Sequence, residues 1–162
     1  MEDSTPVASN IITLAHVAKI VGMPVLVAEQ SPDKLGPTIP KLHDPLSKLG
    51  VYDPIPKMSF SCCGSEDFVQ RVYDSGRDTL IVTGIEAHVC VQQTALDAMN
   101  LGYKLHVVSD AVTSRRREDW SAAKEKMRHA GAIISTTEMV AYELLGKAGT
   151  PEFKAAMAYL KW

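Results

Sequence analysis

The chain has 162 residues, of which 46% are hydrophobic and 22% charged, and its formal net charge is −2. This length suits one domain with one core, so we expect a single domain over residues 1–162. The charge argues against nucleic acid as the main partner, and no apolar run is long enough to span a membrane. Because the start of the chain is polar and the three cysteines form no disulfide framework, we expect a cytoplasmic protein without a signal peptide.

Helix and strand patterns alternate along the chain. Asn10 and Ser65 are typical helix caps, and a proline-rich stretch at 29–56 predicts a long loop. Strands separated by helices imply an α/β fold with one parallel sheet and helices on both faces. We expect helices over 10–21, 66–74, 90–101 and 118–129, two more that begin near Thr136 and Thr150, and strands over 24–28, 79–83, 105–108 and 132–135.

Cys90 is the first candidate for chemistry. The apolar run 79–83 breaks at Gly84, and the cysteine follows where a helix is expected to begin. The first-turn N–H groups and the helix dipole favour a thiolate there and can hold an oxyanion. A free cysteine is also often a small buried apolar residue, and position alone leaves both interpretations open.

Other candidates are expected to gather at the carboxyl ends of the strands, where α/β folds bind ligands. Lys57 either is a surface lysine or stabilises the thiolate as a cation. Asp110 fits a turn or a helix cap better than catalysis. His88 could be a general base for Cys90, although residues two apart need not face each other. The remaining histidines have no metal-ligand spacing and no glycine-rich phosphate loop is present, so we expect neither a metal nor a cofactor.

Several motifs cover nearly the whole chain from Asn10 on. They are Gly84-Ile-Glu-Ala-His-Val-Cys90-Val-Gln-Gln-Thr-Ala-Leu-Asp97, Val107-Val-Ser-Asp110-Ala-Val-Thr-Ser-Arg115, Val27-Ala-Glu-Gln30 followed by Lys34-Leu-Gly-Pro-Thr-Ile-Pro40, Lys57 with Phe60-Ser61, Thr136-Thr-Glu138, and Pro151-Glu-Phe-Lys154. Together they resemble the isochorismatase-like (cysteine hydrolase) superfamily, and most closely its isochorismatase-domain-containing branch.

The resemblance implies a three-layer, Rossmann-like sandwich with a Cys–Lys–Asp triad. Cys90 matches the nucleophile and Lys57 matches the lysine of that triad. A cis peptide is implied at Ile85–Glu86, where the backbone N–H groups of residues 86–90 would face an oxyanion. The resemblance further implies a small-molecule substrate and a homo-oligomer, a dimer or larger. It places the side chains of Gln30, Phe60 and His88 around the substrate.

One part of the family pattern is missing from this sequence. The family begins with a central strand that ends in the catalytic aspartate, but residues 1–9 contain no apolar run, and Asp3 lies too close to the first helix to match. Without that strand, its two neighbours would keep unpaired backbone groups, each costing on the order of 1–3 kcal/mol. We therefore expect either that further residues precede Met1 or that another segment or subunit supplies the strand.

These residues favour a cysteine hydrolase that acts on a C–N bond of a small amide or carbamoyl compound. One alternative is hydrolysis of an isochorismate-type vinyl ether, and another is a non-catalytic scaffold that lacks the aspartate. A nicotinamidase is disfavoured because the stretch after Glu29 lacks the histidines of that group's metal cluster. The ribonuclease label that some members of this branch carry is disfavoured by the acidic charge and by the lack of a histidine pair or a basic face.

Overall fold

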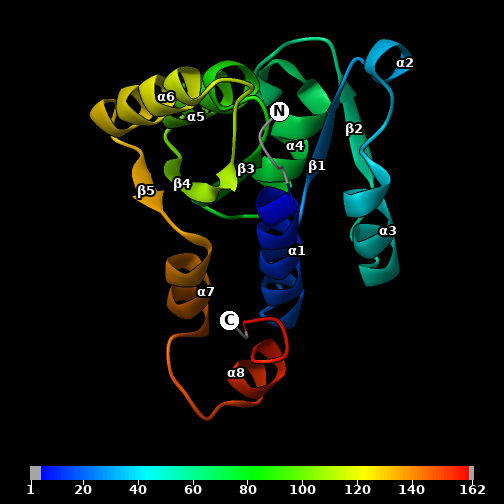
Figure 1. Cartoon of the computed structure of the whole chain (residues 1–162), viewed down its shortest axis with the longest axis vertical. Coiled ribbons are helices and arrows are strands. Elements are labelled where there is room, and N and C mark those ends of the chain that lie inside the picture. The colour runs from blue at the N-terminus through cyan, green and yellow to red at the C-terminus, as the bar shows by residue number, and fades with distance from the viewer. Residues whose placement is uncertain (1–4, 161–162) are drawn as a thin grey trace.

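The computed structural model describes residues 5–160, and Asp3 therefore lies outside the described residues. Helices and strands alternate as the sequence predicts (Figure 1). The strands are β1 (Val27–Gln30), β2 (Pro54–Lys57), β3 (Thr79–Gly84), β4 (Lys104–Val112) and β5 (Ile133–Ser135). The helices are α1 (Thr5–Ile20), α2 (Pro32–Leu35), α3 (Pro40–Leu49), α4 (Glu66–Asp74), α5 (Gln92–Asn100), α6 (Arg117–His129), α7 (Thr137–Leu145) and α8 (Pro151–Ala156), with a 3₁₀ turn η1 (Cys62–Gly64) and a π turn η2 (Ala87–Val91).

The strands form two parallel sheets instead of the single sheet expected from the sequence. In the described part of the chain, β1 pairs only with β2, while β3, β4 and β5 form a separate sheet in that order. Gln30 lies opposite Lys57 at the carboxyl end of the first sheet. The split falls between β1 and β3, which is where the resemblance implies a central strand. The α/β class with parallel strands between helices is confirmed.

The larger sheet lies between two layers of helices. On one face, α1 and α7 contact β4, and Leu14 and Val140 pack against Val108. On the other face, α5 contacts β4 and α6 contacts β5, around a core that includes Ala95 and Met127. Helix α8 packs against α1 beyond the sheet (Figure 1). A strand buried between two such layers is expected to be apolar on both faces.

Two predicted elements are wrong in their details. Asn10 is not the cap of the first helix but lies inside α1, where its amide donates to the carbonyl of Asp110 at 2.7 Å. The stretch 29–56 is not one long loop, because it contains α2, α3 and most of β2. Proline fits there because its fixed φ suits the first position of a helix, as at Pro32 and Pro40, and because an edge strand tolerates it.

Candidate active site

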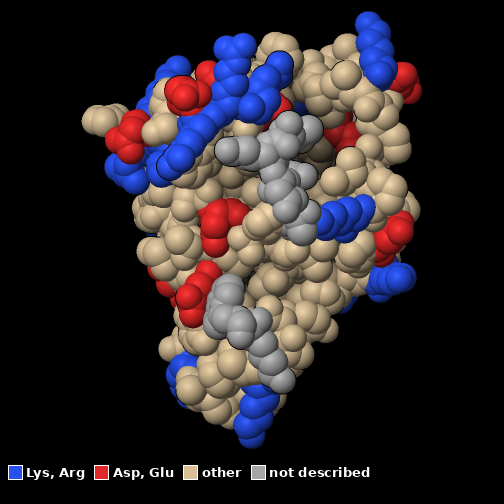
Figure 2. Space-filling view, viewed as in Figure 1, with Lys and Arg blue, Asp and Glu red and all other residues tan. Residues whose placement is uncertain are grey.

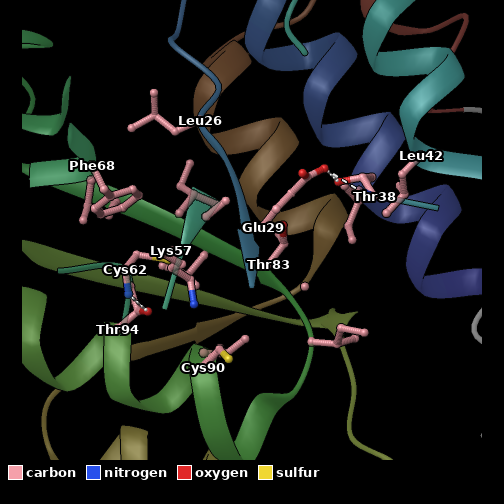
Figure 3. Close-up of a pocket in the computed structure, with 18 of the residues that line it drawn as sticks. Leu26, Glu29, Thr38, Leu42, Lys57, Cys62, Phe68, Thr83, Cys90 and Thr94 are labelled. Carbon is pink, nitrogen blue, oxygen red and sulfur yellow. Dashed lines mark hydrogen bonds between the residues drawn. The ribbon is translucent and has the colours of Figure 1, made fainter. Parts of the chain in front are cut away.

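A cavity of about 810 Å³ separates the two sheets. All six residues of β3 line it on one side, and residues of β1 line it on the other. Cys90, Lys57 and Gln30 lie in its wall, and so does Ile85. The structure therefore brings together residues from three separate motifs of the sequence around one space (Figure 3).

Cys90 lies in the π turn η2, directly before α5. The chain leaves β3 at Gly84, whose φ of 110° favours glycine, and the second peptide bond after it, Ile85–Glu86, is cis. The carbonyl of Glu86 accepts hydrogen bonds from the N–H groups of Val89 and Val91, at 3.1 and 3.2 Å. These contacts hold the turn so that the half-buried Cys90 side chain faces the cavity.

Not every N–H group between Glu86 and Cys90 is available to a ligand. The N–H of Ala87 donates to the carbonyl of Thr113 at 2.9 Å, and that of His88 donates to the hydroxyl of Ser114 at 3.4 Å. The N–H of Val89 is also engaged, as described above. Of the five backbone N–H groups that we expect to face an oxyanion, those of Glu86 and Cys90 therefore remain as candidates.

Lys57 is a buried cation, with 7% of its surface exposed, at the carboxyl end of β2. Its ammonium donates to Gln30 Oε1 at 2.7 Å and to the carbonyls of Ser59 and Phe60 at 2.9 and 2.7 Å. All three acceptors are neutral, and none of the ion pairs among residues 5–160 includes Lys57. In Figure 3 its nitrogen points toward the helix end that carries Cys90.

Gln30 holds Lys57 in place. Its amide nitrogen donates to the carbonyl of Met58 at 2.8 Å while its oxygen accepts from the lysine. The pairing of β1 with β2 puts the two residues opposite each other, so the amide links the ends of both strands. Gln30 thus lies in the cavity wall and also orients the cation.

Cys62 also lies in the cavity wall, although it does not stand where a helix is expected to begin, as Cys90 does. Its N–H donates to the hydroxyl of Thr94, which lies one helical turn beyond Cys90, at 2.9 Å. Burial raises the pKa of the Cys62 thiol above its ordinary value. Its hydrogen bond with Thr94 and the charge of Lys57 act to lower this pKa, while the nearby Cys90 acts to raise it. The signal in the sequence was proximity, since Cys62 follows Lys57 by five residues.

Three side chains that the sequence analysis considered lie outside the cavity wall. Phe60 is 53% exposed and is not part of the cavity wall, although its carbonyl accepts from Lys57. His88 is also outside the wall, with its Nδ1 2.9 Å from the hydroxyl of Ser114. Asp110 lies inside β4 instead of at its end, and its Oδ1 accepts from the N–H and hydroxyl of Thr137 at 2.8 and 3.0 Å. The cap interpretation of Asp110 is therefore the right one.

Glu29 is a buried wall residue that the sequence analysis did not single out. Its Oε1 accepts from the N–H and hydroxyl of Thr38 at 2.7 and 2.6 Å, and from the hydroxyl of Tyr52 at 2.6 Å. Burial acts to raise the pKa of Glu29, but these hydrogen bonds outweigh it, and the pKa lies below its ordinary value. The carboxylate thereby fixes the segment between α2 and α3 against β1 (Figure 3).

The described residues contain neither a metal-binding cluster nor a membrane-spanning helix. Across residues 5–160, no group of three or more His, Cys, Asp or Glu side chains is arranged to hold a metal ion. None of the helices in that range is both long enough and apolar enough to cross a membrane.

Lys and Arg side chains gather over α6 and the residues before it, from Arg115 to Arg128 (Figure 2), so the expectation of no basic face is wrong.

Comparisons with known sequences agree on one family. A family model described as the isochorismatase domain matches residues 1–139. The secreted isochorismatase effector Isc1 of Phytophthora sojae is 37% identical over 152 residues, which cover 92% of this chain and 71% of that protein. Isochorismatase domain-containing protein 2 of Xenopus laevis is 40% identical over 87% of this chain and 66% of its own length, and protein 1 of Danio rerio is 36% identical over 91% and 51%. The chain therefore spans between about half and 71% of these relatives.

Comparisons with solved structures agree on the fold. The MAR1 ribonuclease of Caenorhabditis elegans superposes with a TM-score of 0.86 and 35% identity, over 96% of this chain and 78% of that one. The YcaC gene product of Escherichia coli, described as an octameric hydrolase of unknown specificity, gives 0.85 and 25%, over 98% and 78%. YcaC of Pseudomonas aeruginosa, solved with hexane-2,5-diol and covalent acrylamide, gives 0.83 and 26%, over 95% and 77%.

Proposed function

Because this chain belongs to the isochorismatase family, we propose that it is a hydrolase with Cys90 as nucleophile, acting on a C–N bond of a small amide or carbamoyl compound. The observation that carries this proposal is the position of Cys90 in the wall of the same cavity as the buried Lys57, which has no anionic partner among the described residues. A cation near a thiol favours the thiolate, which is the reactive form.

The proposed reaction has two steps. The thiolate of Cys90 attacks the carbonyl carbon, and the N–H groups of Glu86 and Cys90, with Lys57, stabilise the negative oxygen. The C–N bond then breaks as the leaving amine takes up a proton, which leaves a thioester on Cys90. Water cleaves the thioester, releases the acid and restores the thiol.

The thiol proton needs an acceptor that the described cavity wall does not supply. The wall contains two carboxylates, Glu29 and Asp78. Glu29 is held by Thr38 and Tyr52, and Asp78 binds Lys104 at 3.0 Å before the amino end of β3, far along the strand from Cys90. Neither carboxylate of the described wall is therefore placed to accept the proton from Cys90.

The comparisons support a small electrophilic substrate and an oligomer. Acrylamide is an amide, and it is covalently attached in the Pseudomonas neighbour. The E. coli neighbour is an octameric hydrolase. We extend both features to this chain as part of the proposal: a small amide as ligand and a homo-oligomer as the working form.

Ribonuclease activity is the second candidate. It is favoured by the name of the nematode neighbour and by the basic side chains over α6 (Figure 2). A thiolate that attacks carbonyl carbon contributes nothing to phosphodiester cleavage, so the two candidates make opposite predictions for a cysteine variant.

The test is a panel of small primary amides, carbamoyl compounds and a single-stranded RNA, assayed with the wild type and with Cys90→Ala. We expect one class of amide or carbamoyl compound to be hydrolysed, and the variant to lose that turnover while it keeps its circular dichroism spectrum. Cys63→Ala is the matched control and should retain activity, because Cys63 is outside the cavity wall. Turnover that survives Cys90→Ala would refute the mechanism, and RNA cleavage that survives it would favour the second candidate.

A further inference from the structure

The turn that carries Cys90 is bonded to the segment that follows β4. The N–H of Ala87 donates to the carbonyl of Thr113 at 2.9 Å, and the N–H of Thr113 donates to the carbonyl of Gly84 at 3.3 Å. These bonds continue the pairing of β3 with β4, in which Gly84 lies opposite Val112. Because β4 lies between β3 and β5, the turn is attached to the central strand of its sheet.

Glu86 adds a carboxylate to this attachment. Its Oε2 accepts from the backbone N–H of Arg115 at 2.9 Å and lies 3.8 Å from Nε of the same arginine. The side chain of Glu86 is 20% exposed, so these contacts are largely withdrawn from water. A hydrogen bond accepted by an ionised group is stronger than one accepted by a neutral carbonyl. We therefore expect the carboxylate to be the strongest link between the turn and the segment after β4.

The backbone of Glu86 is the starting point of the same turn. Its carbonyl accepts from the N–H groups of Val89 and Val91, and its own N–H is one of the two that the proposed function assigns to the oxyanion. The side chain thus anchors the residue on which the turn is built. A displacement of about 1 Å in a reacting site can cost about 100-fold in rate, and loss of one oxyanion donor costs roughly 100- to 1,000-fold.

The negative charge of Glu86 is matched on the side away from the cavity. A carboxylate close to a developing oxyanion would oppose it unless another charge compensates. The guanidinium of Arg115 lies 3.8 Å from Glu86 Oε2, and Nδ1 of His88 lies 3.7 Å from it. The side chain of Glu86 is not part of the cavity wall. It is therefore placed to hold the turn from behind and not to touch a substrate.

We propose that the carboxylate of Glu86 is a positioning group for the oxyanion site. By accepting from the N–H of Arg115, it holds the backbone N–H groups of Glu86 and Cys90 in the geometry that receives a tetrahedral oxygen. It acts through the backbone of the turn and contacts neither the substrate nor the sulfur. This inference rests on the proposed function, so its test includes a probe that needs the thiol but no hydrolysis.

The first experiment compares Glu86→Ala with Glu86→Gln on whichever amide or carbamoyl compound the wild type hydrolyses. Glu86→Ala should lower kcat by about 30-fold or more and change KM by less than about twofold, because the transition state loses more than the bound substrate does. Glu86→Gln should keep at least about a third of the wild-type kcat, since its amide oxygen can still accept from Arg115. Equal losses in the two variants, or a change in KM alone, would overturn the proposal.

Controls separate positioning from folding. Asp119→Asn removes another carboxylate near the turn, 3.9 Å from Nε2 of His88, but leaves the bond to Arg115 intact, so its kcat should match the wild type. Thermal melts follow the folded fraction of each variant, and Glu86→Met, which keeps the length of the side chain, replaces Glu86→Ala if that variant does not fold. A lower melting temperature with an unchanged kcat would mean that Glu86 is only structural, and would overturn the proposal.

The second experiment uses acetaldehyde labelled with carbon-13 at the carbonyl carbon. The sulfur of Cys90 bonds to that carbon, the carbonyl π electrons move to the oxygen, and the oxygen takes the thiol proton, which gives a thiohemiacetal. Its oxygen occupies the place of the tetrahedral oxyanion, as in a transition-state analogue. In NMR titrations Glu86→Ala should bind acetaldehyde about tenfold more weakly or worse, and Glu86→Gln nearly as the wild type does. Cys90→Ala identifies the adduct signal, because it should give none.

Iodoacetamide supplies the matching probe, since its reaction with Cys90 forms no oxyanion. It should alkylate the wild type and Glu86→Ala at rates within about threefold of each other. Parallel losses with both probes would mean that Glu86 acts on the thiol itself, and equal acetaldehyde affinities would mean that it positions nothing; either result overturns the proposal. A difference with acetaldehyde in a protein that hydrolyses none of the amides would support the positioning role while the proposed function fails.

Discussion

Replacing Tyr52 by Phe should remove one hydrogen bond from a buried carboxylate and little else. The hydroxyl donates to Glu29 Oε1 at 2.6 Å, while the ring packs edge-on to His43 with centroids 4.6 Å apart, a contact that Phe retains. A hydrogen bond to a charged group contributes about 1.5–3 kcal/mol, so the free energy of unfolding should fall by that amount near pH 7. The melting temperature should fall by roughly 3–12 °C for a chain of this size.

The loss should depend on pH with a definite sign. Because the pKa of Glu29 is lower in the folded protein than its ordinary value, its contribution is present above the unfolded pKa and disappears as the pH falls through the folded one. Urea denaturation should show the full cost of Tyr52→Phe near pH 7, and the cost should shrink progressively as the pH falls below the ordinary glutamate value of about 4.3.

Two further variants make this prediction refutable. Tyr73→Phe is the matched control, since Tyr73 is 74% exposed and should lose almost nothing. In a Glu29→Gln background, Tyr52→Phe should cost less than in the wild type, because the charge is gone. If Tyr52→Phe costs under about 0.5 kcal/mol near pH 7, or the same at both pH values, then Glu29 is not held as described.

The remaining predictions concern Lys57, Asp110 and His16. Lys57→Met should slow the alkylation of Cys90 by iodoacetamide near pH 6.5 by roughly tenfold, because the nearby positive charge is lost. An unchanged rate would mean that the charge of Lys57 does not affect the reactivity of Cys90. Asp110→Ala should lower the free energy of unfolding by about 1–3 kcal/mol in urea titrations, and Thr137→Val, which removes one of the two hydrogen bonds, should cost less; the reverse order would refute the cap. Burial lowers the pKa of His16, which stacks on Tyr159, so stability should decline as the pH falls below about 6.5, and His16→Gln should flatten that decline in thermal melts across this range.

Local chemistry made part of the fold predictable. The hydroxyls of Ser65 and Thr150 accept from N–H groups three residues later, as their positions before a helix indicate. The prediction that Asn10 caps the first helix is wrong because α1 begins at Thr5, and the Asn10 side chain donates to the carbonyl of Asp110 instead. The prediction of a long loop over 29–56 is wrong because proline begins a helix or lies in an edge strand as readily as in a loop.

The site was predictable only as separate pieces. The sequence indicates why Cys90 sits at a turn before a helix, but the approach of Lys57 depends on the pairing of β1 with β2 and on the amide of Gln30. The sequence could not show that Phe60 and His88 lie outside the cavity wall, because a motif gives their position along the chain and not the direction of their side chains. The division into two sheets leaves one edge of β1 and one edge of β3 unpaired among residues 5–160, whereas the alternating pattern of the sequence predicts a single sheet.

The most direct test of the central claim is the rate at which each cysteine reacts with iodoacetamide across the pH range, followed by mass spectrometry. We expect Cys90 to be alkylated at mildly acidic pH, ahead of Cys62 and Cys63, whose thiol pKa values are raised by burial. If Cys90 reacts no faster than the other two, and only near about pH 8.5 as an ordinary thiol does, the cavity between the sheets does not hold a nucleophile.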